Sequence, residues 1–454
     1  MRRRDLAGLI LASAVITLDG TAATLALPAI GRDLAVPVSQ IQWISNAPLL
    51  MLAAMLLPAG AIADRWGRIR MARLGVVLFA AASAACIAAP SAPWLIAARG
   101  VQGLAGALVL PSVLAVLRAA LADPAERTRT FGIWAAWTGV ASAAGPLVGG
   151  GLVDLGSWRA VFAVSAGAAL AAAVLLRGRA PVAQPSSARP VPAVATVALT
   201  LLLGSLAYAL IEAPDTGWRS APVLLAGALA AAGGTLLRVA PKRHVLFPRE
   251  LLGAHNCLPA NGATFALYFG MFGLSFLLVM YTQQVLGFSA LRAAIGLLPI
   301  SVMLFLAEPF GRLAPRLGTR RIIVIGGCLA GAGILWIGLG PHPLPFWSHI
   351  LAGTAAFGLG VSLAVSALTH AAVSAVPESC AGAASGFNHA VVRGAGLIAI
   401  ALLGSLAAPG RADAVTVEGF RQAMIVCAAL VAAGSAVSAL LVRDEKAGGL
   451  RQAA

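Results

Sequence analysis

The chain has 454 residues, of which 60% are hydrophobic and 11% are charged, whereas soluble domains carry roughly 25% charged residues. This composition excludes a soluble enzyme and predicts an all-α polytopic membrane protein, and the continuous rather than alternating apolar runs argue against a β-barrel. The formal net charge of +16 does not indicate a nucleic-acid partner, because the basic residues stand in short blocks between apolar runs.

Fourteen apolar segments have about the length that a bilayer span requires. The predicted helices cover residues 6–28, 41–63, 74–92, 94–117, 131–153, 160–176, 193–211, 220–237, 258–286, 291–311, 322–340, 346–374, 386–408 and 420–442. Of the 32 Lys and Arg residues, 24 fall at the two termini and in alternate gaps, and six fall in the other gaps. By the positive-inside rule, both termini are expected in the cytoplasm, with the protein in the cytoplasmic membrane.

Two six-helix halves with an insert are the expected domain organisation. The parts are an N-terminal six-helix bundle (1–177), a cytoplasmic linker (178–192), two inserted transmembrane helices (193–238), a cytoplasmic connection (239–257), a C-terminal six-helix bundle (258–442) and a cytoplasmic tail (443–454). The linker is rich in Pro, Ser and Arg, which is typical of an unstructured segment. The connection is basic and partly amphipathic, so it is expected to lie along the inner membrane face.

The first predicted span contains a carboxylate, Asp19, with no basic residue beside it. A charged carboxylate deep in a span is unfavourable, so Asp19 is expected to be neutral, paired or in a water-filled cavity. Ionisable residues within spans mark proton or substrate pathways by default, which predicts that Asp19 carries the proton or is where proton and substrate compete. The alternative is a helix-bending residue bonded to Thr21 or to a backbone amide.

An internal repeat follows the second and tenth predicted spans. The stretches are GAIADRWGRIRM (60–71) and GRLAPRLGTRRI (311–322), in which Gly60 and Gly67 match Gly311 and Gly318 at an offset of 251 residues. A repeat between two halves of a helical membrane protein is typical of transporters. The glycines let a helix end and the chain reverse tightly, and the arginines anchor the turn at the inner leaflet.

The stretch GAIADRWGR resembles the signature hairpin of the major facilitator superfamily. Three further stretches resemble motifs of its fourteen-helix drug:proton antiporters: LDGTAATLALP (18–28) in the first helix, RGVQGLAGA (99–107) in the fourth and GVASAAGPLVGG (139–150) in the fifth. Thr24 replaces the usual Asn of the first-helix motif, and Ala141 replaces a usual Gly in the fifth. The resemblance extends over the whole chain, including the two extra helices.

This resemblance implies proton-driven efflux of small, often amphipathic molecules across the cytoplasmic membrane. No cofactor is expected, because the proton gradient is the energy source and the sequence contains no GxxxxGK[ST] phosphate loop. No metal site or catalytic residue is expected either. The expected partners are a small-molecule substrate, protons and the lipid bilayer, and we expect a monomer. The alternatives are a dedicated exporter of one endogenous metabolite, such as a self-made antibiotic or siderophore, and a transport-inactive sensor or scaffold.

The resemblance also implies roles for particular residues. Because family members place helices 1 and 4 around the cavity, Arg99 is expected to couple with Asp19, the alternative being an inert link to backbone carbonyls. The helix-5 motif is expected to act as a seal and pivot between the halves; its residues are Gly145, Pro146, Gly149 and Gly150. Asp64 is expected to dock on a helix start near residues 382–386 as a conformational latch, with a solvated loop charge as the alternative. The other latch residues are Gly60, Arg65, Gly67 and Arg68.

The last group of candidates is a substrate or second proton site. Glu308 lies in the tenth predicted helix, where Arg312 at i+4 equally suits a plain helix-end salt bridge. The remaining candidates are polar residues on spans that line the cavity in the superfamily, or beside Arg99: Gln102, Asn261, Tyr268 and His370. The alternative for Gln102 is a polar lining residue only. Most hydroxyls in spans bond their own backbone, and the sequence does not indicate which of the other residues face the cavity.

Overall fold

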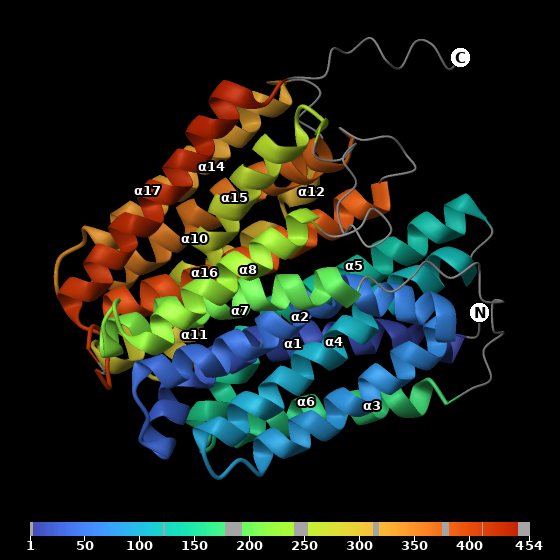
Figure 1. Cartoon of the computed structure of the whole chain (residues 1–454), viewed down its shortest axis with the longest axis horizontal. Coiled ribbons are helices and arrows are strands. Elements are labelled where there is room, and N and C mark those ends of the chain that lie inside the picture. Colours follow the sequence, from blue (N-terminus) through green and yellow to red (C-terminus); the bar gives the residue numbers. More distant parts are fainter. Residues whose placement is uncertain are drawn as a thin grey trace. The chain divides into compact units, whose positions relative to one another are not determined.

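The computed structural model describes residues 3–120, 123–177, 193–239, 253–311, 317–374, 381–410 and 412–443, and these residues form helices and no strand (Figure 1). The first eight helices are α1 (Arg3–Leu34), α2 (Val38–Trp66), α3 (Arg68–Ile87), α4 (Ala92–Ala120), α5 (Pro124–Asp154), α6 (Arg159–Leu175), α7 (Ala193–Thr216) and α8 (Ala221–Val239). The later elements are α10 (Cys257–Gln284), α11 (Ala290–Leu304), α12 (Ala307–Gly311), α14 (Thr319–Gly338), the π-helical turn η2 (Phe346–Leu351), α15 (Ala352–Ser374), α16 (Ala381–Ala407) and α17 (Val417–Leu441).

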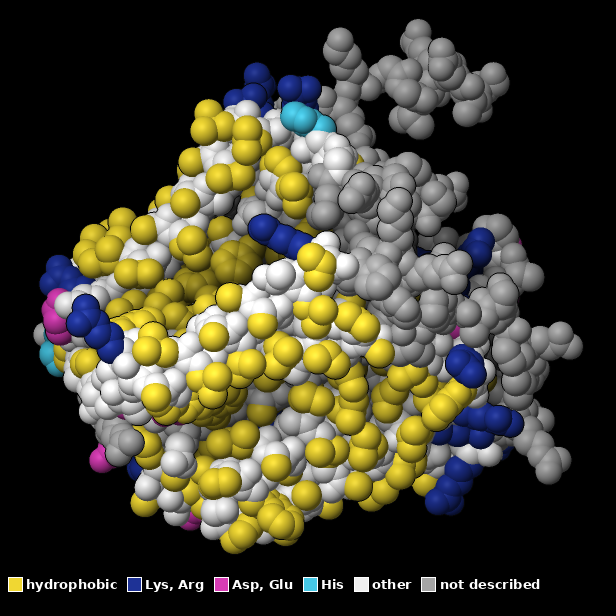
Figure 2. Space-filling view, in the orientation of Figure 1, with side chains coloured by type: hydrophobic (Ala, Val, Ile, Leu, Met, Phe, Trp, Pro, Cys, Tyr) yellow, Lys and Arg dark blue, Asp and Glu magenta, His cyan; other side chains and the backbone are white. Residues whose placement is uncertain are grey.

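The all-helical membrane architecture is confirmed. Within the described residues, eleven helices are long and apolar enough to cross a bilayer, and α2, bent by 57° beside Pro58, makes a twelfth. Two shorter apolar helices, α6 and α11, have 17 and 15 residues. Figure 2 shows hydrophobic side chains over most of the helical surface in view, with Lys and Arg side chains mainly at its margins. Each of the fourteen predicted segments falls on a described helix; the count of fourteen spans and the cytoplasmic termini stay predictions.

Many helix bounds differ from the sequence prediction by several residues; α3, for example, is Arg68–Ile87, whereas residues 74–92 were predicted. Two of the differences have a clear local cause. Helix α5 begins at Pro124 instead of residue 131, because the Asp123 carboxylate caps it by accepting hydrogen bonds from the Ala125 and Glu126 amides at 3.2 and 3.1 Å. The predicted segment 291–311 is broken between α11 and α12. Pro309 has no N–H to donate to the carbonyl of Phe305 four residues earlier, which interrupts the helix at this point.

The chain forms two compact units. Unit 1 comprises residues 1–246, 276–295 and 400–416, and unit 2 comprises residues 247–275, 296–399 and 417–454. In unit 1, α1 packs on α5 and α6, α4 packs on α2 and α3, and α7 pairs with α8 and contacts α2. In unit 2, α14 packs against both α15 and α17. The predicted linker (178–192) and tail beyond Arg443 lie outside the described residues, as does most of the predicted connection 239–257.

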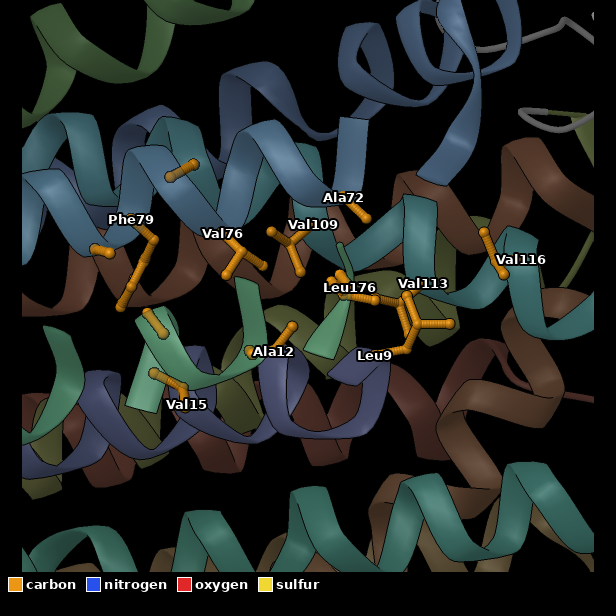
Figure 3. Close-up of a cluster of buried hydrophobic side chains, with 14 of the residues drawn as sticks. Leu9, Ala12, Val15, Ala72, Val76, Phe79, Val109, Val113, Val116 and Leu176 are labelled. Atoms are coloured by element: carbon orange, nitrogen blue, oxygen red, sulfur yellow. The ribbon is translucent and has the colours of Figure 1, made fainter. Parts of the chain in front are cut away.

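Small and branched side chains fill the interior of unit 1. Leu9 and Val15 of α1, Val76 and Phe79 of α3, and Val109 of α4 are buried against one another (Figure 3). A lipid-facing helix gains no hydrophobic energy by packing on another helix, so close van der Waals contact must hold these helices together. Small residues permit that contact, because they let the backbones approach closely.

Helices α2 and α4 approach each other closely at Gly103. A methyl group added there would meet the backbone of Pro48, with the Pro48 Cα at 2.6 Å, whereas one added at Gly100 would lie 3.8 Å from the Met51 side chain. Gly103→Ala is therefore expected to destabilise the protein by about 1–3 kcal/mol, the usual range for overpacking. Gly100→Ala is the matched control on the same helix. Equal unfolding midpoints of the two variants in a detergent titration would contradict this reading of the interface.

Candidate functional site

A buried ion pair joins the first and fourth helices. The Arg99 Nη1 of α4 donates to the Asp19 Oδ2 of α1 at 2.6 Å, and the two side chains are 6% and 4% exposed. Of the four ion pairs among the described residues, this is the only one in which both side chains are buried. The structure thus brings together the acid and the base that the sequence proposed as partners 80 residues apart.

Gln102 contacts both members of the ion pair. Its Oε1 accepts from Arg99 Nη1 at 2.7 Å, and its Nε2 lies 3.4 Å from Asp19 Oδ1 and donates to the Ser83 hydroxyl at 2.8 Å. Gln102 lies one turn after Arg99, so both side chains share a face of α4. In the structure its amide bonds both members of the ion pair, and its predicted role in a substrate or second proton site stays a prediction.

The remaining contacts of Arg99 are weak. Its Nε points at the Ile44 carbonyl at 3.5 Å, and its guanidinium carbon lies 5.6 Å from the centre of the Phe162 ring. The Thr21 hydroxyl donates to the carbonyls of Thr17 and Leu18, not to Asp19. The alternative in which Asp19 bonds to Thr21 is thus not what the structure shows. In the described part of the chain, Asp19 is the only carboxylate that Arg99 contacts, and the charges of the two groups cancel in an apolar surrounding.

The helix-5 motif packs α5 on two neighbours. A Cβ at Gly145 would meet Thr21, and one at Gly149 would lie 2.8 Å from the Cα of Ala22. The two glycines therefore allow α1 to pack closely against α5. A Cβ at Gly150 would lie 2.8 Å from the Cα of Leu291, at the start of α11, and Pro146 lies inside the helix between these contacts. These contacts fit a packing role; the role as a pivot stays a prediction.

Three side chains join the first-half helices to segments 276–295 and 400–416, all within unit 1. The Gln42 amide donates to the carbonyls of Ile400 and Ala401, both at 2.7 Å, and Gln283 donates to the Leu25 carbonyl at 3.1 Å. The Asp154 carboxylate at the end of α5 accepts from the amides of Ala290 and Leu291 at 2.8 and 2.9 Å. Asp154 thereby caps the N-terminus of α11 from another helix.

Removing this cap is expected to loosen the start of α11. Loss of an N-terminal cap is worth about 1 kcal/mol, so Asp154→Ala is expected to raise the exchange rate of the amides around residues 290–291 roughly fivefold. Hydrogen–deuterium exchange with peptide mapping measures this directly. The control is Asp413→Ala, an exposed acid in the segment 412–416 that precedes α17. Unchanged exchange in Asp154→Ala would show that the cap contributes nothing in solution.

The predicted latch residues form a tight turn between α2 and α3. Gly67 has a φ of 100°, and Gly318, its counterpart in the repeat, has a φ of 87°, so both occupy a region that favours glycine. The Asp64 Oδ1 pairs with Arg68 Nε at 2.8 Å within this turn, and Arg65 is exposed. Gly60 has open space around it. Docking of Asp64 near residues 382–386 stays a prediction.

The other candidate residues belong to unit 2. In unit 2, Asn388 donates to Asn261 at 3.1 Å, Asn261 donates to the Cys257 carbonyl at 2.8 Å, and Tyr268 is half-buried. His370 is exposed on α15, and the side chain of Glu308 lies outside what the structure describes. Its two interpretations therefore both stay open.

Sequence reasoning missed Ser83, Gln42 and Asp154. A serine or glutamine in an apolar run has no distinguishing pattern, since most such groups bond their own backbone, as the Ser83 hydroxyl also does to Phe79. Asp154 did have a signal: an acid at the end of a span, four residues after Gly150. What the sequence did not indicate was its partner, the start of a helix 136 residues away.

Comparisons with known proteins agree with this architecture. A family model described as the Major Facilitator Superfamily matches residues 9–401. The chain is 32% identical over 399 residues to the multidrug resistance protein Stp of Mycobacterium tuberculosis, covering 87% of this chain and 74% of that protein. It is 32% identical over 411 residues to the tetracenomycin C resistance and export protein of Streptomyces glaucescens, with the same two coverages. The solved structure of the POT family transporter PepTSo shares the fold, with a TM-score of 0.71 at 17% identity, covering 97% of this chain and 98% of that one. The family model, the relatives and the fold together establish that this chain belongs to the major facilitator superfamily.

Proposed function

We propose that this protein exports small amphipathic molecules from the cytoplasm in exchange for protons, with Asp19, Arg99 and Gln102 as the coupling site. The observation that carries the proposal is the buried Asp19–Arg99 pair, because ionisable groups inside spans are rare and mark proton or substrate pathways. Relatives named for multidrug resistance and for antibiotic export support the direction of transport. The proton gradient is the proposed energy source, and no cofactor is assigned.

Protonation of Asp19 is the proposed switch. Ionised Asp19 neutralises Arg99, whereas protonated Asp19 leaves a buried guanidinium with only neutral acceptors, Gln102 and the Ile44 carbonyl. A buried charge without a counter-ion is strongly unfavourable, so protonation favours a conformation in which water or substrate reaches Arg99. A proton and a conformational change are thereby linked through one ion pair, which is the differential stabilisation that coupling requires.

Alternating access would break one set of contacts and form another. The contacts of Gln42, Gln283 and Asp154 would have to separate before the side of the membrane opposite the basic turns could open. The turn at Asp64 would close the cytoplasmic side in the opposite state. A monomer suffices for this cycle, because both halves are on one chain.

Broad and narrow specificity are both represented among the relatives. One is named for multidrug resistance, and others are named for single antibiotics, such as the methylenomycin A resistance protein of Bacillus subtilis at 31% identity. A dedicated exporter therefore stays the second candidate. A panel of compounds distinguishes the two, since a broad pump transports several unrelated members.

Everted membrane vesicles test the proposal. Vesicles acidified inside by respiration are given lipophilic dyes of positive, zero and negative charge, and luminal pH and dye uptake are followed. A transported dye is expected to raise the luminal pH in wild-type vesicles and not in vesicles without the protein. Dye uptake that persists unchanged after a protonophore collapses the gradient would exclude proton coupling.

A further inference from the structure

A second intramembrane charge, Arg393, lies near the middle of α16, in unit 2. The surrounding span, Ala384–Ala407, has a mean hydropathy of 2.0, and the Arg393 side chain is half-buried within it. None of the four ion pairs among the described residues includes Arg393. Arginine cannot lose its proton in a protein, so this charge needs a counter-ion or water inside the membrane.

Among the described residues, the titratable groups within electrostatic range of Arg393 are Tyr268 of α10 and His389, one turn earlier on α16. Two contacts hold the helices together on either side of this point. Asn388 donates to Asn261 at 3.1 Å, and a Cβ at Gly396 would lie 2.7 Å from the Phe272 ring. Arg393 and Tyr268 are thus positioned between two fixed contacts.

These groups are suited to a negatively charged ligand. The guanidinium has five N–H donors in a fork that matches a carboxylate, and the Tyr268 hydroxyl adds another donor. His389 is either neutral or positive, so no group of the described residues that faces Arg393 supplies a negative charge to attract a cation. The half-buried setting strengthens a charge-assisted hydrogen bond relative to one in water.

We propose that Arg393 and Tyr268 form the site that binds the acid group of the exported substrate, so that the substrates include amphipathic aromatic carboxylates. This inference rests on the proposed export function and specifies its substrate class. The aromatic part of such a molecule would lie against the apolar lining of α10 and α16, of which the Phe272 ring is a part. The Asp19–Arg99 pair stays free to handle the proton, because a different arginine holds the substrate.

The charge of the substrate sets how the membrane potential acts. When a monoanion leaves and a proton enters, both movements carry positive charge inward, so an inside-negative potential drives the exchange. When a monocation leaves for one proton, the charges cancel and the potential has no effect. Electrogenic transport is therefore a second consequence of an anion site at Arg393.

Three matched probes test the site: 2-naphthoate, 2-naphthamide and 2-naphthylmethylammonium. They share the ring system and differ in charge. Binding to the full-length protein in detergent is measured by thermal stabilisation, which rises with ligand concentration relative to Kd. The wild type is expected to bind the carboxylate roughly tenfold more tightly than the amide, as a charge-assisted hydrogen bond predicts, and to bind the ammonium most weakly.

Substitutions at Arg393 and Tyr268 test whether these residues cause the preference for the carboxylate over the amide. Arg393→Gln is expected to bind carboxylate and amide alike, Arg393→Lys to keep part of the preference, and Tyr268→Phe to reduce it severalfold. The control is Arg421→Gln, an exposed arginine of α17, which should keep the full preference. Because each result is a ratio between ligands within one variant, a general loss of stability cancels, and the Lys and Phe variants decide the matter if Arg393→Gln does not fold.

The outcomes separate this inference from the proposed function. Equal or absent stabilisation by the three probes, a preference for the ammonium, or a carboxylate preference that survives Arg393→Gln would overturn the anion site and leave proton-driven efflux standing. Binding is measured without a gradient, so a retained anion preference together with protonophore-resistant efflux would overturn only the proton coupling.

Discussion

Asp19→Asn is expected to abolish uphill efflux while the protein still folds and reaches the membrane. Asparagine keeps the size of the side chain and permanently resembles protonated aspartic acid, so the site can no longer exchange a proton. Arg99 retains Gln102 Oε1 at 2.7 Å and the Ile44 carbonyl as neutral acceptors, so the variant is expected to fold with reduced stability. Downhill movement of substrate does not require the proton and is expected to persist.

The measurement is accumulation of a transported dye against its gradient in everted vesicles, with expression matched to the wild type. Asp33→Asn is the control, because Asp33 lies on the same helix and also pairs with an arginine, Arg159 at 2.7 Å, but is about half exposed. It is expected to transport normally. If Asp19→Asn still concentrates the dye as the wild type does, Asp19 is structural, and Glu308 becomes the next candidate for the proton.

The sequence predicted the fold class and the two charges of the site because both leave signals that need no knowledge of tertiary contacts. Apolar runs longer than a bilayer span define the helices, and a charge inside such a run is conspicuous by itself. The pairing of Asp19 with Arg99 required more. It came from the resemblance to the superfamily, whose members place helices 1 and 4 around the cavity, since no local pattern relates two residues 80 positions apart.

The remaining features of the site depend on which face of each helix is turned inward. In a membrane, lipid and protein interior are both apolar, so the polar and apolar faces that orient a soluble helix are weak. For this reason Gln102 could be placed beside Arg99, but not assigned to the ion pair. The Asp154 cap and the Gln42 contacts were missed because their partners are backbone groups. Every residue carries such groups, so no residue type in the sequence marks the partner.

The polar start of α5, in contrast, did have a local signal in the sequence. Asp123 followed by a proline is a capping signal that extends the helix beyond its apolar part, and the prediction from hydropathy alone began seven residues late. Hydropathy reports where a helix meets lipid, whereas caps report where it begins. The two agree only when the chain turns at the membrane surface.

Arg99→Gln is expected to destabilise the protein by about 3–5 kcal/mol, the usual loss when one partner of a buried ion pair is removed. Asp19→Asn is expected to lose at least as much, because the Arg99 guanidinium cannot lose its proton and retains only two neutral acceptors, Gln102 and the Ile44 carbonyl. The Asp19 carboxylate that Arg99→Gln leaves with the Gln102 amide at 3.4 Å can instead be neutralised by a proton. Unfolding in mixed detergent and SDS micelles measures the difference. Uphill efflux should be lost in both single variants.

The double variant Asp19→Asn/Arg99→Gln separates pairing from packing. It leaves no buried charge without a counter-ion, so it is expected to be more stable than Asp19→Asn, even though it carries one more substitution. The matched control is the cycle of Asp33→Asn and Arg159→Gln, a pair with nearly the same distance whose side chains are 47% and 35% exposed. Exposed pairs are worth about 1 kcal/mol or less, so its coupling should be small. Additive losses at Asp19 and Arg99 would mean that the two charges do not depend on each other, and the proposed link between protonation of Asp19 and release of Arg99 would then have no physical basis.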